Sequence, residues 1–93
     1  MGKLTLSGYI EVPEAALEAV RKELPRHIAL TREEEGCIVF KVVQDESCPN
    51  RFNVHEEFLD EESFKRHQER IKTSEWSGVT AGVGRHYTIE RQR

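Results

Sequence analysis

Apolar and polar residues alternate at the start of the chain. Between residues 4 and 12 the apolar side chains fall on alternate positions with polar or amphipathic residues between them, which is typical of a strand with one buried face. The alternating apolar residues are Leu4, Leu6, Ile10 and Val12. Gly8 interrupts this row, and a glycine inside a strand indicates a bulge or a place where a ligand approaches the backbone closely. We therefore expect a first strand here.

The apolar period lengthens to three or four residues after Pro13, a residue that suits the first turn of a helix. The apolar stripe of this helix consists of Leu17, Val20, Leu24 and Ile28. Pro25 interrupts the helix, where it removes the hydrogen bond to the carbonyl of Arg21 and would cost about 3 kcal/mol in a straight helix. We therefore expect a kink or break at Pro25, a second helical piece over residues 27–33, and a stop at Gly36.

A strand, a turn and another strand follow. Residues 37–43 are rich in β-branched residues, and residues 45–50 have the composition of a turn. Residues 51–58 again alternate, and one face of this strand carries Phe52, Val54, Glu56 and Phe58. The two strands are predicted to form an antiparallel hairpin.

The last third of the chain predicts one more helix and one more strand. Asp60 is a good N-cap, and the two glutamates after it suit the first turn, where the helix dipole favours negative charge. The inward stripe of this helix consists of Phe64, His67 and Ile71. The pattern loosens over residues 73–84, which hold one tryptophan and three glycines, and residues 85–90 form the final strand.

The elements follow the order β-α-β-β-α-β, which predicts an α+β fold of the ferredoxin-like kind. Right-handed crossovers would place both helices on one face of a four-stranded antiparallel sheet. The opposite face carries alternating apolar and amphipathic groups and has no helix to cover it. A second copy of the sheet is the simplest cover, so we expect a homodimer of a single domain that spans residues 1–93.

The overall charge excludes some classes of partner. A net charge of −3 and a pI near 5.8 argue against a nucleic-acid binder, which normally presents a basic face. No apolar stretch approaches the roughly 20 residues that a bilayer span needs, and the N-terminus lacks the apolar core of a signal peptide. We therefore expect a cytoplasmic protein with no nucleic-acid or membrane partner.

Both cysteines are expected to be free thiols. In the predicted hairpin Cys37 lies opposite Phe58, whereas Cys48 lies at the tip. That separation exceeds the roughly 7 Å between α-carbons that a disulfide can span. Free thiols are consistent with a reducing compartment.

The stretch HIALTREEEGCIVFKVVQDESCPNRFNVHEEFLDEESFKRHQER, residues 27–70, resembles the antibiotic biosynthesis monooxygenase domain family. Members typically read TR-x-EPGC, then a hairpin, then F-x-x-x-E-x-W/F-x-D, and a histidine on the following helix. The matching positions here are His27, Thr31, Arg32, Glu34, Gly36, Cys37, Phe52, Glu56, Phe58, Asp60 and His67. Glu35 stands where the family usually has proline. With the flanking strands, the resemblance covers nearly the whole chain.

The resemblance implies a dimeric α+β barrel of ferredoxin-like subunits, with a small-molecule pocket between the helices and the sheet. Several members oxygenate quinols or polyphenols without a metal or a flavin, whereas others degrade haem or isomerise a phosphorylated sugar. The haem-degrading members need an asparagine on the first strand, where this chain offers Ser7. The resemblance therefore supports the fold more strongly than the reaction.

His67 and Glu56 are the candidate catalytic residues. Burial would lower the pKa of His67 and a neighbouring carboxylate would raise it, so His67 can titrate near neutrality and act as a general base. The alternative is a core histidine whose nitrogens bond to the backbone. Glu56 shares an apolar strand face, where an isolated carboxylate is unfavourable, so we expect a partner such as His67, His27 or Arg85. It either orients the histidine or makes a structural ion pair.

The candidate substrate-binding residues are Trp76, His27, Phe52 and Phe64. Trp76 is interpreted as a lid over an aromatic pocket, made mobile by Gly78 and Gly82, or as a plug at the end of the core. His27 lies at the edge of the apolar stripe of the first helix, about one turn beyond Leu24, and is expected to line the same pocket. The residues assigned to a surface or an interface are His55 and His86, and Tyr9 is assigned to the pocket or an interface.

The remaining patterns predict neither a metal nor a cofactor. The sequence HEEFL at residues 55–59 lacks the second histidine of a metalloprotease motif and lies on a predicted strand. The glycine-rich GVTAGVG has no lysine for phosphate and no strand directly before it. We expect no cofactor and no metal.

The resemblance, together with the position of His67, implies a cofactor-independent monooxygenase that acts on a small aromatic, quinol- or polyphenol-like substrate. His67 would deprotonate the substrate, and the resulting anion would pass an electron to O₂. One alternative is an isomerase or lyase of a small carbonyl compound, which would turn over without oxygen. The other is a non-catalytic dimeric module that binds a small molecule.

Overall fold

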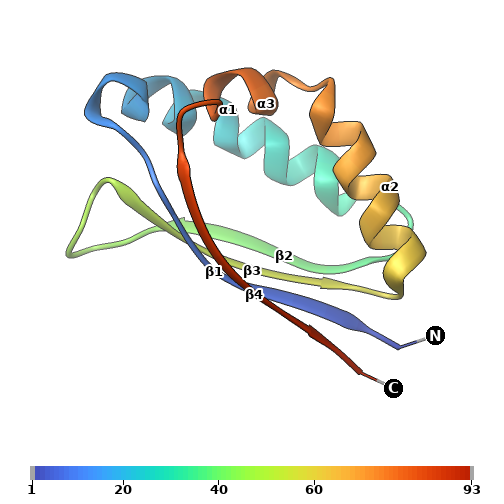
Figure 1. Ribbon diagram of the computed structural model, residues 1–93. Coiled ribbons are helices and arrows are strands. Elements are labelled where there is room, and N and C mark those ends of the chain that lie inside the picture. Colours follow the sequence, from blue (N-terminus) through green and yellow to red (C-terminus); the bar gives the residue numbers. More distant parts are fainter. Residues whose placement is uncertain (1, 93) are drawn as a thin grey trace.

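Four strands form one sheet, and all the helices cover the same face of it (Figure 1). The structure is a computed structural model that describes residues 2–92. Its elements are β1 (Leu4–Glu11), α1 (Glu14–Arg32), β2 (Cys37–Gln44), β3 (Arg51–Phe58), α2 (Glu61–Lys72), α3 (Glu75–Val79) and β4 (Gly84–Arg91). The predicted ferredoxin-like order β-α-β-β-α-β is confirmed, and α3 is an additional short helix before the last strand.

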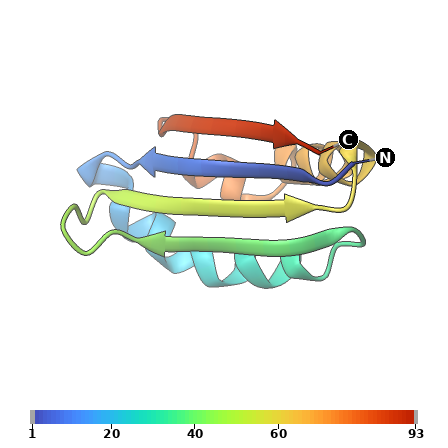
Figure 2. The ribbon, with the colours of Figure 1, turned by 90° about the horizontal axis from the view of Figure 1, so that it is seen from below.

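The strands lie in the order β2-β3-β1-β4, and all neighbours are antiparallel (Figure 2). The central strand β1 places Leu6 opposite Glu56 of β3 on one side and Ile89 of β4 on the other. On the other edge of the sheet Cys37 lies opposite Phe58, as predicted for the hairpin. Strands β2 and β4 are therefore the two edges of the sheet.

The core lies between the sheet and the helices. Strands β1, β2 and β3 contribute most of it, and α1 and α2 add Val20 and Phe64. The buried strand residues are Leu4, Leu6, Ile10, Phe40, Val42, Phe52, Val54 and Phe58. By contrast, all 8 residues of β4 are exposed. The helices therefore leave this edge strand largely uncovered, which decides where the site described below can open.

Helix α1 runs without interruption for 19 residues and contains Pro25, so the predicted break is wrong. Pro25 and Arg21 both lie on the exposed side of the helix. The Arg21 carbonyl, which loses its usual N–H partner, can therefore bond to water instead. The inward side keeps its packing, because Val20 and His27 are buried there.

Polar side chains cap the two following helices. Asp60 accepts a hydrogen bond from the Ser63 amide at 2.8 Å, as predicted for an N-cap. Ser74 caps α3 in the same way by accepting from the Ser77 amide. The segment without a clear apolar period therefore contains a short helix, and this helix carries Trp76.

The face of the sheet without helices, here called the open face, is more polar than predicted. Alternation and register place on it Thr5, Ser7, Tyr9, Glu11, Val39, Lys41, Val43, Arg51, Asn53, His55, Glu57, His86, Thr88 and Glu90. Tyr9 stacks on His86 with 4.7 Å between ring centroids, and the Arg51 guanidinium lies 4.0 Å from the Tyr9 ring. Val43 is the large exposed apolar residue of this face, which was expected to carry more such residues.

The thiols of Cys37 and Cys48 are both free, as expected. Over residues 2–92, no helix combines the length and the apolar character that a membrane span requires.

Candidate functional site

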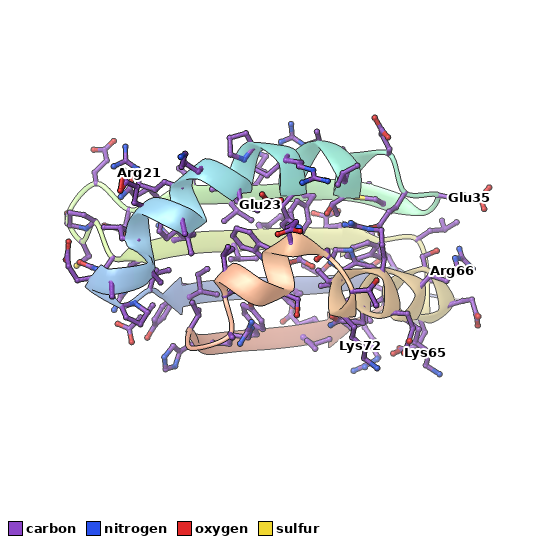
Figure 3. All side chains as sticks on the ribbon, turned by 90° about the horizontal axis from the view of Figure 1, so that it is seen from above. Arg21, Glu23, Glu35, Lys65, Arg66 and Lys72 are labelled. Carbon is purple, nitrogen blue, oxygen red and sulfur yellow. The ribbon has the colours of Figure 1, made fainter. Side chains whose placement is uncertain are left out.

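A cavity of about 370 Å³ lies between the sheet and the helices. Its volume falls at the lower end of the range for small-molecule pockets, roughly 300–1,000 Å³. The lining residues are Leu6, Ile10, His27, Phe40, Val42, Val54, Glu56, His67, Gln68, Ile71, Lys72, Trp76, Ser77, Thr80, Val83, Arg85 and Tyr87. These side chains come from all four strands and all three helices (Figure 3). Apolar side chains make up about half of this lining and polar side chains the other half, so the cavity offers both apolar contact and hydrogen-bonding groups to a ligand.

The cavity opens between α2 and the edge strand β4. Its deeper lining residues, including His27, Glu56 and His67, are buried. The exposed ones are Gln68 and Lys72 of α2 and Arg85 and Tyr87 of β4. Since exposed lining residues mark the mouth, a ligand would enter past β4, which the helices leave uncovered.

His67 is oriented by Glu34, a residue in the turn after α1. The His67 Nδ1 lies 3.0 Å from Oε1 of Glu34 and 3.2 Å from Oε2. A carboxylate can only accept a hydrogen bond, so Nδ1 carries the ring proton and donates a hydrogen bond to Glu34. The lone pair of the neutral ring is then on Nε2, which faces Glu56 at 3.9 Å.

Glu34 is itself held by Arg70 of α2. The Arg70 Nε donates to Glu34, and its Nη2 donates to the Thr31 hydroxyl at 2.9 Å. Thr31 is buried near the end of α1. The chain thus ties the end of α1 to α2, and it fixes the direction of the His67 ring through residues about 33 positions away in sequence.

His67 is a neutral imidazole at neutral pH. It is 2% exposed, and this burial lowers its pKa, while the nearby Glu34 carboxylate opposes the shift. A neutral ring with Nε2 unprotonated is the form that a general base requires.

Glu56 is a neutral carboxylic acid at the same pH. It is 7% exposed, and burial, with a smaller contribution from Glu34, raises its pKa to about 8. Its Oε1 is 3.9 Å from the His67 Nε2, too far for a direct hydrogen bond. Of the three partners predicted for Glu56, His67 is the one that the structure brings closest. The two groups can both reach a ligand oxygen placed between them at about 3 Å from each.

His27 and Trp76 form a stacked pair that lines the cavity. Their ring centroids are 4.4 Å apart with an angle of 7° between the planes. Burial lowers the pKa of His27 to about 3, so this ring is neutral as well. Its Nδ1 is buried and has no hydrogen-bond partner among the described residues. The same two rings also wall a second, more polar cavity of about 290 Å³ between α1 and the α2–α3 junction.

The other sequence-predicted residues lie elsewhere. Phe52 and Phe64 belong to the core, where Phe64 packs edge-on against Phe58, so their predicted contact with a ligand has no support in this geometry. Tyr9 and the two histidines assigned to a surface, His55 and His86, lie on the open face.

Sequence reasoning missed Glu34 and Tyr87 as parts of the site, and it named Arg85 as a possible partner of Glu56 without assigning it to the cavity. Glu34 was part of the family pattern, but nothing in the spacing placed it beside His67. Tyr87 and Arg85 share the strand parity of Ile89, which faces the same side as Leu6. This alternation could have shown that both side chains face the helices and therefore the cavity.

The described residues contain no group of three His, Cys, Asp or Glu side chains that could hold a metal ion. The arrangement instead offers a base, an acid and a hydrogen-bonded carboxylate around a partly apolar space. Burial and the phenol's proximity to Glu56 raise the pKa of Tyr87, so this phenol adds an uncharged donor.

One comparison with known proteins shows the family. Residues 4–76 match the family model described as antibiotic biosynthesis monooxygenase. A comparison with curated proteins gives no match.

Similar solved structures include two candidate antibiotic biosynthesis monooxygenases. The one from Nitrosomonas europaea is 18% identical with a TM-score of 0.77, and the match covers 98% of this chain and 88% of that chain. The one from Bacteroides thetaiotaomicron is 22% identical with a TM-score of 0.77, covering 99% and 88%. A protein from Pseudomonas aeruginosa is 24% identical with a TM-score of 0.74, covering 99% and 93%. At these identities the structures show a common fold.

Proposed function

The chain belongs to the antibiotic biosynthesis monooxygenase family, and from this membership and the site we propose that it oxygenates a small aromatic quinol or polyphenol without a cofactor. The observation that carries the proposal is the neutral His67, oriented by Glu34 with Nε2 directed into a partly apolar cavity. His27 and Trp76 supply flat surfaces against which an aromatic ring can stack.

In the first step His67 acts as the base. Its Nε2 accepts the proton of a phenolic hydroxyl, and Glu34 stabilises the imidazolium that forms. The electron-rich phenolate then transfers one electron to O₂, and the resulting substrate radical and superoxide combine to form a carbon–oxygen bond. The substrate supplies the electrons, so the protein supplies position and proton transfer.

In the second step Glu56 acts as the acid. The imidazolium of His67 first returns its proton to the peroxide anion. The neutral Nε2 then takes the proton on the oxygen-bearing carbon while the O–O bond breaks and a carbonyl forms. The departing hydroxide takes a proton from the neutral Glu56 carboxyl and leaves as water, and the proton on His67 passes to Glu56, which restores both groups. One oxygen atom of O₂ thus ends in the product and the other in water. Glu56 suits this role because it remains protonated at neutral pH.

A second candidate function is supported by the same pair. A neutral base beside a neutral acid is also suited to moving a proton between carbon and oxygen in a small carbonyl compound, as an isomerase or lyase does. The two functions differ in their need for oxygen. Turnover of a carbonyl substrate under anaerobic conditions would support the second one.

The test of the oxygenase is oxygen uptake with a panel of quinols. We expect His67→Gln to lower kcat by about 10²–10⁴-fold, the range for loss of a general base. Glu34→Gln should lower kcat less, and it should move the acidic limb of the pH profile to lower pH, because Glu34 opposes the burial that lowers the pKa of His67. The matched control is His86→Gln, which removes a histidine from the open face. Full oxygen uptake by folded His67→Gln would exclude His67 as the base.

We also propose that the protein acts as a homodimer through the open face of the sheet. The support is the exposed sheet surface itself, which carries acidic and basic side chains side by side. The cavity lies on the opposite face, so such a dimer would leave the active site intact.

A further inference from the structure

The mouth of the cavity is lined by hydrogen-bond donors and by positive charge. Its exposed lining residues are Gln68, Lys72, Arg85 and Tyr87. Figure 3 shows Lys72 at the end of α2, on the side of the molecule where β4 lies. Among all the residues that line this cavity, Glu56 is the one carboxyl group, and it is neutral at pH 7. The site therefore presents cations without an ionised acid inside it.

Arg85 differs from Lys72 in having no acidic partner. The Lys72 Nζ donates to Glu69 at 3.0 Å, so its charge is already compensated at the surface. Arg85 has no carboxylate within 4.0 Å among the residues that the structure describes. An unpaired arginine at the mouth of a partly apolar cavity is a natural place for an anionic ligand group.

The guanidinium of Arg85 is also held in one orientation. Its Nη1 donates to the Val83 carbonyl at 3.3 Å, and its Nη2 donates to the Thr80 carbonyl at 3.2 Å and to the Thr80 hydroxyl at 3.3 Å. Thr80 is buried, and its hydroxyl donates to the Trp76 carbonyl at 2.6 Å. Arg85 is thus anchored to the segment that carries Trp76. A guanidinium has five N–H donors, so it keeps free donors for a ligand.

We propose that the cavity binds an aromatic molecule that bears a carboxylate or a similar anionic group, with the ring between Trp76 and the sheet and the anion on Arg85. This inference rests on the proposed function for placing an aromatic ring in the cavity. It adds a class of substrate and names Arg85 as the residue that determines specificity for it. A hydroxylated benzoate has this chemistry, whereas an uncharged quinol has only its ring and hydroxyls.

The test compares two ligands that differ in charge and hardly in shape, 4-hydroxybenzoate and 4-hydroxybenzamide. Their dissociation constants are measured by calorimetry, and the fluorescence of Trp76, the single tryptophan of the chain, reports whether they enter the cavity. We expect the benzoate to bind about tenfold more tightly than the amide, the range for a charge-assisted hydrogen bond. Added salt should reduce this preference.

Variants of Arg85 assign the preference to one side chain. Arg85→Gln should reduce it to about twofold or less, and Arg85→Lys should keep part of it because the charge remains. Arg21→Gln is the matched control, because Arg21 is exposed on α1 and lines neither of the two cavities. Equal binding of the two ligands by the unmodified protein, binding of neither, or an undiminished preference in folded Arg85→Gln would overturn the proposal.

Oxygen uptake separates this inference from the proposed function. The substrates are 2,5-dihydroxybenzoate and 2,5-dihydroxybenzamide, which are both quinols. Uptake that strongly favours the carboxylate supports both ideas. Equal uptake with the amide keeps the oxygenase and overturns the anionic substrate. Tight, Arg85-dependent binding of the benzoate with no uptake of oxygen from either quinol keeps the inference and overturns the oxygenase.

Discussion

Single residues set the chemistry of this site by opposite shifts of their pKa values. Burial keeps His67 and His27 unprotonated and keeps Glu56 protonated, so groups that ordinarily differ in charge all become neutral. Glu34 and Arg70 form an ion pair just outside the cavity lining. The ionised pair Glu34 and Arg70 therefore orients His67 without lining the cavity, while the neutral base His67 and the neutral acid Glu56 face the ligand. Such separation of pKa values is the usual mark of acid–base assignments in an active site.

Glu56 makes a prediction about stability. In the unfolded chain its pKa is near 4.5, whereas in the folded protein it is about 8. Between these values the unfolded state releases the proton and the folded state keeps it, so the free energy of unfolding falls as the pH rises, on the order of 1 kcal/mol per pH unit. Glu56→Gln removes this effect. We expect its stability relative to the unmodified protein, measured by urea unfolding, to increase from about pH 5 to about pH 8.

The comparison has an internal control. His27 and His67 have lowered pKa values, so they destabilise the fold on the acid side, but they are present in both proteins and cancel in the difference. A difference in unfolding free energy that stays constant with pH would show that Glu56 is ionised in the folded protein at neutral pH.

The sequence identified site residues that lie on a helix or a strand, where a regular period shows which side chains point inward. His67 and Glu56 were identified because helix period and strand parity turn both inward. The partner of His67 was not, because Glu34 lies in a turn with no period, 33 residues away from His67, and meets it only when α1 and α2 pack side by side. Phe52 and Phe64 share the inward faces too, but parity cannot distinguish a core position from one beside a cavity.

At the scale of elements, β1 is the strand that shapes the floor of the site. Leu6 and Ile10 line the cavity, and Gly8 lies between them without a side chain. Gly8 has a φ of +147°, in a region that favours glycine, and a Cβ there would lie 1.9 Å from the His86 carbonyl oxygen. The sequence marked this position as a bulge or a close approach. The approaching group is the backbone of β4.

We therefore expect Gly8→Ala to destabilise the protein by about 3 kcal/mol, because it adds backbone strain to a clash with backbone atoms that cannot move independently. Thermal or urea unfolding measures this. Gly78→Ala is the matched control, since a Cβ at Gly78 meets nothing within 4 Å, and alanine is the better helix former in α3. A Gly8→Ala protein as stable as Gly78→Ala would contradict the geometry.

The elements also show where local signals were insufficient. A proline breaks a helix when the carbonyl that it leaves without a partner is buried, but here Arg21 and Pro25 are both exposed residues, and burial of Val20 and His27 keeps α1 continuous. Helix α3 has only five residues, too few for an apolar period, and Ser74 was its one local sign. The hairpin and the placement of the helices on one face of an antiparallel sheet followed correctly from pairing and crossover rules, because those rules act on whole elements.

The whole molecule has one covered and one open sheet face, and this much followed from the number of helices. The polarity of the open face was not predicted correctly, because the sequence analysis expected more apolar side chains there. The face instead carries acidic and basic side chains in contact: Glu11 pairs with Arg51 and lies beside His86, and Glu57 pairs with Lys3 and lies beside His55. A surface of a single sign would repel its own copy. A mixed surface can complement itself across a twofold axis, since each acid can meet a base of the second copy.

A dimer through this face makes a direct prediction. Ser7 is exposed on the open face of the central strand, opposite His55 and Thr88. We expect light scattering at micromolar concentration to give twice the chain mass of 10.8 kDa for the unmodified protein. Ser7→Arg places a bulky charge at the centre of the interface and should give a monomer, whereas Ala29→Arg, on the exposed side of α1, should leave the dimer intact. A monomeric unmodified protein would contradict the dimer, and the separate cavity on the helix face could then still bind its ligand.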